Sequence, residues 1–188
     1  YDFVELAFDL AFKYRTPTMI LSDGIIGQMM EKLEIGPQKP RRTPEEIAKQ
    51  CPWATVGKPK NRERNIITSL DLSAVRQEEK NLKLQAKYKE IREKEVRYEL
   101  INCEDADYIL VAYGSSARLS MKAMDILRAK GVKVGILRLI TLFPFPTKII
   151  KEITPKVKGF LAVEMSCGQM VEDLRLAVEF KKPVEHFG

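Results

Sequence analysis

The chain has 188 residues, of which 45% are hydrophobic and 31% charged, a composition typical of a globular protein with one good core. No apolar run approaches the roughly 20 residues that cross a bilayer, and no basic-then-apolar leader opens the sequence, so we expect no membrane association. The net charge of +6 arises mainly in residues 37–65, which hold a single aromatic residue, Trp53. Nucleic-acid binding is also not expected, because single strands are bound by interleaved aromatic and basic side chains.

The first 36 residues predict one helix and one strand. Apolar residues fall at helical spacing over residues 3–14, and Pro17 ends this pattern because a proline disfavours helical geometry in the residue before it. Thr18–Leu21 then predicts a buried strand that ends at Ser22-Asp23-Gly24, with a short helical piece after it. Since one helix and one strand cannot form a domain, residues 1–36 are predicted to be the remnant of a domain that begins upstream.

Residues 37–70 are predicted to be a linker, because the segment is rich in proline, glycine and basic residues. Within it, Thr43 is suited to cap a short helix that extends to about Gln50. A long helix should then begin near Asp71 or Ser73 and end near Glu95, supported by charge pairs at i,i+4 spacing.

The last 118 residues, 71–188, predict a layered α/β domain. The period changes from helical to alternating at Val96–Ile101, which indicates a half-buried strand. Three apolar runs follow, each leading through a short turn into a helical segment, and they predict strands covered on both faces by helices. These runs are Tyr108–Tyr113, Val132–Leu139 and Phe160–Val163, and Lys182–Phe187 predicts a last strand.

The candidate site residues lie where predicted strands lead into helices: Ser115, Ser116, Glu164 and Gln169. In open α/β sheets these strand ends carry the contacts that matter for function. The Gly114-Ser115-Ser116 turn allows two interpretations, an anion site at a helix N-terminus or a glycine turn with a serine cap, and capping is the commoner. The G-x-G-x-x-G and G-x-x-x-x-G-K-[ST] patterns are absent, so a nicotinamide-dependent dehydrogenase has no support.

Glu164 ends a buried strand, where an unpaired carboxylate would be costly. We expect it to accept hydrogen bonds from the turn Ser166–Gln169 or from a partner chain, and a general base is the alternative. Cys167 is predicted to be a buried structural thiol, because the only histidine, His186, lies in a tail that we expect to be poorly anchored. One histidine and three scattered cysteines give no zinc or iron–sulfur pattern, and the odd cysteine count fits a reducing cytoplasm.

The amino-acid sequences of several turns resemble those of one protein family. The resemblance is carried by Ala-Tyr-Gly-Ser at 112–115 with Arg118, Leu-Phe-Pro-Phe-Pro at 142–146, Val163-Glu164, Gly168-Gln169-Met170, and Asp-Leu-Arg-Leu-Ala at 173–177. These segments resemble the C-terminal portion of the alpha subunit of the 2-oxoacid:ferredoxin oxidoreductases, in particular the branched-chain (2-oxoisovalerate) type. The chain departs from the pattern at Ser166, where the family usually has asparagine.

The resemblance implies a three-layer α/β sandwich like the transketolase C-terminal domain, with an antiparallel strand ahead of the parallel set. It implies a complex with beta, gamma and ferredoxin-like subunits that converts a 2-oxoacid to an acyl-CoA and passes electrons through iron–sulfur clusters to ferredoxin. Thiamine diphosphate and Mg²⁺ would sit between the alpha and beta subunits, with coenzyme A as co-substrate. The activating glutamate would lie upstream, so we expect this chain alone to hold no catalytic, cofactor-binding or metal-binding residue and to be inactive.

Two other classes remain open. One is the C-terminal domain of a different thiamine enzyme, such as a pyruvate dehydrogenase beta chain, and the other is a non-enzymatic interaction domain of the same fold. Among substrates, branched-chain 2-oxoacids fit the wording best, and 2-oxoglutarate is second. We expect the Ser115–Ser116 and Met165–Gln169 turns to serve assembly, because neither holds an acid–base pair or an activated nucleophile.

Overall fold

The structure is a computed structural model that describes residues 1–37, 40–54, 58, 60 and 63–188. The chain forms two compact units, one of residues 1–21 and 28–84 and the other of residues 22–27 and 85–188. Among the described residues, none of the helices combines the length and the apolar character that crossing a bilayer requires.

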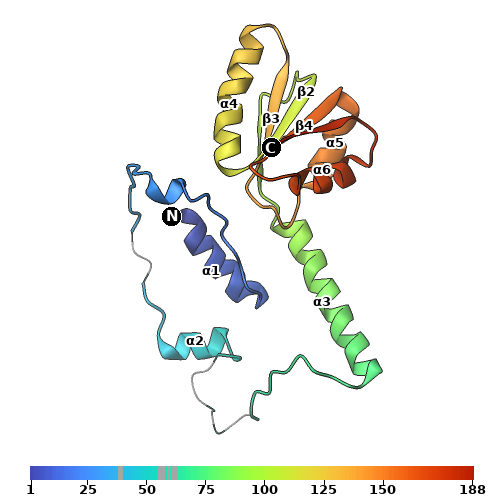
Figure 1. Ribbon diagram of the computed structural model, residues 1–188. Coiled ribbons are helices and arrows are strands. Elements are labelled where there is room, and N and C mark those ends of the chain that lie inside the picture. Colours follow the sequence, from blue (N-terminus) through green and yellow to red (C-terminus); the bar gives the residue numbers. More distant parts are fainter. Residues whose placement is uncertain (38–39, 55–57, 59, 61–62) are drawn as a thin grey trace. The chain divides into compact units, whose positions relative to one another are not determined.

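The first unit contains the helices α1 (Asp2–Tyr14) and α2 (Pro44–Gln50), both predicted from the sequence (Figure 1). Thr43 caps α2 as expected, since its hydroxyl accepts from the Glu46 N–H while the Glu46 carboxylate accepts from the Thr43 N–H. The ring of Phe12 on α1 lies 5.7 Å from that of Trp53. The capping box at Thr43 and Glu46 thus defines where α2 begins.

The predicted buried strand at Thr18–Leu21 is wrong. These residues are not in a strand, and Met19 and Leu21 are 80% and 65% exposed. A strand needs a neighbouring strand for its backbone hydrogen bonds, and in the described part of this unit no strand lies beside this segment. The helical piece expected after it is present as the 3-10 helix η1 (Ile26–Gln28).

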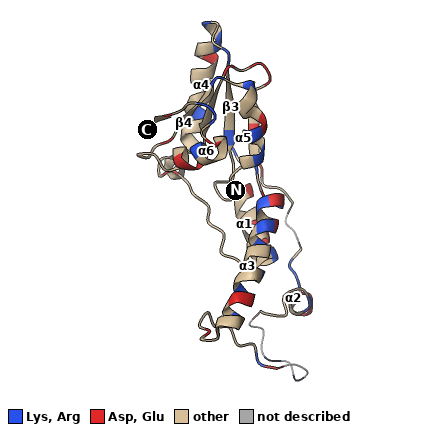
Figure 2. Cartoon of the chain, turned by 90° about the vertical axis from the view of Figure 1, so that its right-hand side faces the viewer, with Lys and Arg blue, Asp and Glu red and all other residues tan. Residues whose placement is uncertain are grey.

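The long helix α3 (Ala74–Lys94) matches the prediction in its bounds, and it buries little of its surface. Only Ile91 is buried on it, and Leu82 upstream is 64% exposed. Its last turns contact the α/β unit, where Tyr88 meets Phe143 edge-on with ring centroids 6.4 Å apart. Basic and acidic residues are interspersed along the helix (Figure 2).

The second unit is built on a five-stranded sheet with the order β1-β3-β2-β4-β5. Its strands are β1 (Tyr98–Ile101), β2 (Tyr108–Ala112), β3 (Val134–Leu139), β4 (Gly159–Val163) and β5 (Val184–Phe187). The edge strand β1 runs antiparallel to β3, and all other neighbours are parallel. The predicted antiparallel edge strand is thus confirmed, although it begins two residues later, at Tyr98 rather than Val96.

Helices cover both faces of this sheet, which confirms the three-layer α/β class (Figure 1). Helix α4 (Gly114–Ala129) lies on one face, and α5 (Thr147–Ile153) and α6 (Met170–Val178) lie on the other, with the 3-10 helix η2 (Thr154–Lys156) after α5. Alternation along β2 supplies both cores: Ile109 and Val111 pack with α5 and α6, whereas Leu110 packs under α4.

The turn between β1 and β2 packs directly against β3 at Gly135. A Cβ atom at this position would lie 2.7 Å from the Asn102 carbonyl oxygen and 2.9 Å from both Cα and Sγ of Cys103. The Cys103 thiol donates to the Ile136 carbonyl at 3.3 Å, and its burial raises the pKa of that thiol. Glycine is therefore required here for the two backbones to approach.

Arg128 fastens the same turn from α4. Its Nε donates to the Val134 carbonyl, and its Nη2 donates to the Asn102 carbonyl and to the Asp105 carboxylate, all at 2.7 Å. The hydrogen bond from the Arg128 guanidinium favours the charged form of the Asp105 carboxyl and therefore lowers its pKa. One guanidinium thus joins α4, β3 and the β1–β2 turn.

Replacement of Arg128 by alanine should lower the free energy of unfolding clearly more than a substitution at an exposed position of the same helix, because two backbone carbonyls and a carboxylate lose a charged donor. Urea unfolding followed by circular dichroism would measure the change. Lys122→Ala, at an exposed position of the same helix, is the control and should change stability by less than about 0.5 kcal/mol. Equal effects of the two substitutions would contradict the role assigned to Arg128.

Candidate functional site

The carboxyl ends of β2 and β4 lie side by side and place the sequence-predicted residues at one rim of the sheet. The two strands are parallel neighbours, and Ala112 is paired with Val163. The chain after β2 enters α4 through Tyr113 and Gly114, and the chain after β4 begins with Glu164. The expected meeting of the two turns at one rim follows from this register.

Glu164 is 2% exposed, and its carboxylate accepts hydrogen bonds from the turn before α6 and from the first residues of that helix. Its Oε2 accepts from the Ser166 hydroxyl at 2.7 Å and from the N–H groups of Gln169 and Met170 at 3.3 and 2.9 Å. Its Oε1 accepts from the Val171 N–H at 3.1 Å. The carboxylate therefore caps α6 from the preceding strand and closes the Met165–Gln169 turn, as the first of the two sequence interpretations expected.

The pKa of Glu164 is lowered, as the outcome of two opposed effects. Burial raises the pKa of this carboxyl, but the hydrogen bonds from Ser166, Met170, Val171 and Gln169 favour its charged form and prevail. A carboxylate held in this way is a weak base. The geometry therefore argues against the general-base alternative and favours a structural carboxylate.

His186 lies beside Glu164, a neighbour that the sequence reasoning missed. It sits on β5, paired with Ala162 of β4, and its Nε2 is 3.5 Å from Glu164 Oε1 and 3.2 Å from the Ser166 carbonyl oxygen. The expectation of a poorly anchored tail is wrong, because β5 continues the parallel ladder and Phe187 accepts from the Glu164 N–H at 3.1 Å. The predicted last strand at Lys182–Phe187 is itself confirmed, since β5 spans Val184–Phe187.

The Asp23 carboxylate caps the first turn of α4, as the Glu164 carboxylate caps α6. The Ser115 N–H donates to Asp23 Oδ2 at 3.1 Å. Hydrogen bonds from the Ser115 side chain and backbone lower the pKa of Asp23. Asp23 also went unrecognised as a site residue, because 92 positions separate it from Ser115 in the sequence.

Tyr113 lies at the same rim. Desolvation raises the pKa of its phenol, and the negative charges of Glu164 and Asp23 raise it further. The rim thus combines two carboxylates with a phenol that stays neutral at physiological pH. In this part of the described chain both carboxylates are used as caps of helix starts.

The four sequence-predicted residues contribute in different ways. Glu164 acts through its side chain, whereas Ser115 and Gln169 donate their backbone N–H groups to the two carboxylates. Ser116 is buried on α4, and the side chain of Gln169 is exposed. The structure therefore brings all four to one rim, and the close contacts join Glu164 to Gln169 and Ser115 to Asp23.

The prediction that Cys167 is a buried thiol is wrong, since this residue is exposed. The backbone of the turn is drawn inward by its hydrogen bonds to Glu164, so the side chains of Met165 and Cys167 are left on the outside. Gly168 permits the turn with its φ of +108°.

The described residues contain no group of three or more His, Cys, Asp or Glu side chains placed to hold a metal ion. A groove of about 370 Å³ lies between the ends of α5 and α6 and is lined partly by Lys151, Lys181 and Glu179. Hydrogen bonds from the two lysines lower the pKa of Glu179 to about 2, so these cations already have a counter-ion. The groove is therefore not proposed as a site. The candidate site is the rim, where the two carboxylates fix the backbones of the two turns.

Residues 106–188 match the family model described as pyruvate:ferredoxin oxidoreductase core domain II. The matched part of the chain holds β2 to β5 and the whole rim except Asp23, so the similarity to that domain includes the candidate site.

The chain is 46% identical to the ketoisovalerate oxidoreductase subunit VorB of Methanothermobacter marburgensis over 91% of this chain and 47% of that protein. It is 34% identical to the 2-oxoglutarate synthase subunit KorA of Archaeoglobus fulgidus, over 97% of this chain and 51% of the relative. The chain thus spans about half the length of the curated relatives it matches. The ketoisovalerate relative bears the letter B, so the expected alpha designation does not follow from these names.

A solved structure, the 2-oxoglutarate:ferredoxin oxidoreductase of Magnetococcus marinus, superposes with a TM-score of 0.54 at 22% identity. The superposition covers 62% of this chain and 21% of that one. At this identity the likeness shows a shared fold alone.

Proposed function

We propose that the chain is part of the alpha subunit of a 2-oxoacid:ferredoxin oxidoreductase of the branched-chain type. The observation that carries the branched-chain type is the 46% identity to a ketoisovalerate oxidoreductase subunit over nine-tenths of the chain, whereas the alpha designation rests on the resemblance of the turns. The reaction would be oxidative decarboxylation of a branched-chain 2-oxoacid to its acyl-CoA, with ferredoxin as the electron acceptor. The alternative substrate is 2-oxoglutarate, and its support is the more distant similarity to the 2-oxoglutarate synthase subunit KorA.

In this proposal the complex, with its beta, gamma and ferredoxin-like subunits, holds thiamine diphosphate, Mg²⁺ and iron–sulfur clusters. The described residues of this chain do not fit a site for them, since the rim carboxylates are taken up by helix N–H groups and no metal-ligand cluster is present among these residues. We therefore assign no catalytic step to this chain, and a cytoplasmic location remains a prediction.

The substrate is tested by a panel on the assembled complex. We expect 2-oxoisovalerate to give kcat/KM at least about ten-fold higher than 2-oxoglutarate or pyruvate when ferredoxin reduction is followed. A preference for 2-oxoglutarate would support the KorA-like alternative. Absence of 2-oxoacid-dependent ferredoxin reduction in an intact complex would contradict the proposed activity.

We further propose that the Met165–Gln169 turn serves subunit assembly. The support is physical: Glu164 fixes the backbone of the turn, while the side chains of Met165, Cys167 and Gln169 are exposed on it. A rigid turn that presents side chains is suited to a preorganised interface.

Gln169→Ala in the assembled complex tests this role, because the exposed side chain can be removed while the backbone N–H to Glu164 is kept. We expect weaker subunit association, measured by analytical ultracentrifugation, with kcat of the assembled fraction unchanged. Glu172→Ala, at an exposed position in the first turn of α6, is the matched control. Turnover lost by orders of magnitude in a normally assembled complex would sink the assembly proposal and indicate chemistry at this rim.

A further inference from the structure

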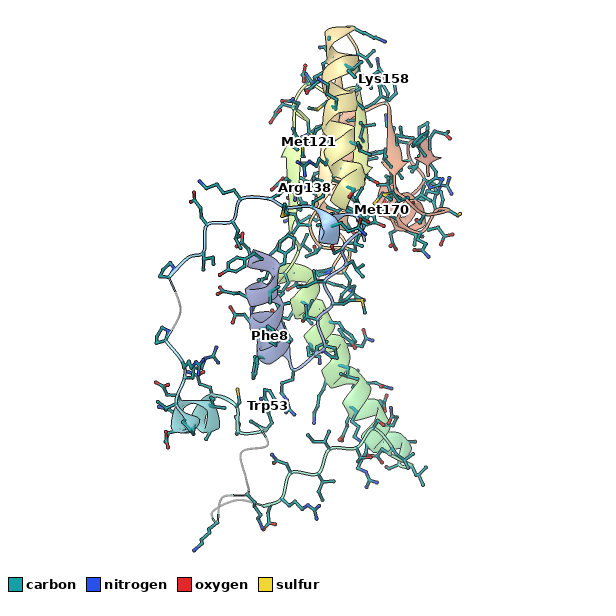
Figure 3. All side chains as sticks on the ribbon, turned by 60° about the vertical axis from the view of Figure 1, so that its left-hand side comes forward. Phe8, Trp53, Met121, Arg138, Lys158 and Met170 are labelled. Carbon is teal, nitrogen blue, oxygen red and sulfur yellow. The ribbon has the colours of Figure 1, made fainter. Side chains whose placement is uncertain are left out.

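Among the described residues, the hydrogen bonds that join Ser22–Gly27 to the rest of the α/β unit involve the side chain of Asp23. This segment groups with residues 85–188, although the segments on both sides of it belong to the other unit. Its short turn lies beside the start of α4, where the Ser115 N–H donates to Asp23 (Figure 3). The α/β unit is therefore discontinuous in sequence: it contains residues 22–27 and then residues 85–188.

The hydrogen bonds of the segment divide into two kinds. Those from the Ser22 hydroxyl and the Ile26 N–H both go to the Asp23 carbonyl and stay within the segment. In the described part of the chain, the hydrogen bonds that reach the rest of the unit end on the Asp23 carboxylate.

Packing adds little to this attachment. Ile25 and Ile26 are 61% and 45% exposed. A Cβ atom built on Gly24 or Gly27 would meet no heavy atom within 4 Å. The hydrogen bonds from the segment to the rest of the unit are thus concentrated at one residue, Asp23.

The point of attachment is well matched to a carboxylate. Asp23 Oδ2 receives the Ser115 N–H at 3.1 Å and would lie 3.3 Å from a Cβ on Gly114, which has a φ of +54°. The first N–H groups of a helix lack partners within the helix, and its dipole favours a negative charge there. A side chain at position 114 would press on the Asp23 carboxylate, and the positive φ of Gly114 also favours glycine there.

We propose that Ser22–Gly27 is a strap over the first turn of α4, latched by the Asp23 carboxylate, and that it opens without unfolding of the sheet. When the latch is closed, Asp23 caps α4 at the rim beside Tyr113 and Glu164. When it is open, the first N–H groups of α4 are accessible from the rim. The strap is independent of the function proposed above.

Amide hydrogen exchange of the full 188-residue chain tests the strap, with wild type, Asp23→Ala and Asp23→Asn compared at pH 7. We expect the Ser115 N–H and the Ile26 N–H to exchange about ten-fold faster in Asp23→Ala, and less so in Asp23→Asn, which keeps an acceptor but loses the charge. The amides of β2 and β4 should keep their wild-type rates. Ser22→Ala, which removes only a bond within the segment, is the control and should leave Ser115 unchanged.

Two results would overturn the proposal. The first is an unchanged rate for Ser115 in both Asp23 variants, because the carboxylate would then hold nothing in place. The second is faster exchange throughout β2 and β4, because Asp23 would then support the sheet and the segment would not open separately. The Asp23→Asn variant separates these outcomes even if the alanine variant folds poorly.

Discussion

Replacement of Glu164 by alanine is expected to lower the free energy of unfolding by about 3 kcal/mol or more, because it leaves buried N–H groups without an acceptor. Met170 and Val171 are 4% and 2% exposed, so water does not readily replace the lost carboxylate. Glu164→Gln should cost less, since its amide oxygen can still accept from one side of the turn. Urea unfolding of the purified chain would measure both values.

The control for Glu164 is Glu172→Ala, since Glu172 is an exposed acidic residue in the first turn of α6. Its loss should cost no more than about 1 kcal/mol, the usual size of a charge–dipole interaction at an exposed helix end. If Glu164→Ala proved no more destabilising than this control, the capping role would be refuted.

The same carboxylate predicts a pH dependence with a definite sign. The pKa of Glu164 is lower in the folded chain than the ordinary glutamate value of about 4.3, so folding favours its ionised form. Its contribution to stability is complete above that ordinary value and is lost as the pH falls through the lowered pKa. The stability difference between wild type and Glu164→Gln should therefore be constant from pH 6 to 8 and shrink below about pH 4.

The second large effect is expected at Gly135, where Gly135→Ala should destabilise the chain by about 3 kcal/mol. The added methyl group would meet the Asn102 carbonyl and the Cys103 Cα, which are backbone atoms that cannot rotate away. The β1–β2 turn would have to move off β3, so β1 should lose protection from hydrogen exchange before the parallel strands do.

Gly27→Ala is a suitable control for Gly135, because a Cβ at Gly27 would meet nothing within 4 Å. Its effect should be close to zero or slightly stabilising, since alanine restricts the unfolded chain. Wild-type stability of Gly135→Ala would show that the turn can move away at no cost and would contradict the close approach.

The sheet could be predicted because its signals are local. The alternation at Val96–Ile101 and the apolar runs at Tyr108 and Phe160 each indicate a strand within a few residues, and short βα turns fix the rest. The Thr18–Leu21 error has the same origin. Three apolar residues in a row, Met19 to Leu21, predict burial, but burial depends on a neighbouring strand that no local pattern contains.

The site was only half predictable for a related reason. Glu164 could be matched to its turn because its donors lie within seven residues of it. Asp23 and His186 reach the rim through tertiary structure, from positions 92 residues before Ser115 and 20 residues after Ser166. The exposure of Cys167 likewise depends on which atoms the Glu164 carboxylate draws inward, and spacing does not reveal that.

The division of the chain into two discontinuous units has a practical consequence for anyone who shortens the gene. A product that starts after Leu84 would contain every strand of the sheet, yet α4 would begin without the Asp23 carboxylate. Residues 22–27 cannot be restored by moving that starting point a few codons upstream, because the whole of residues 28–84 lies between. A truncation after Leu84 therefore separates α4 from the Asp23 carboxylate that caps it.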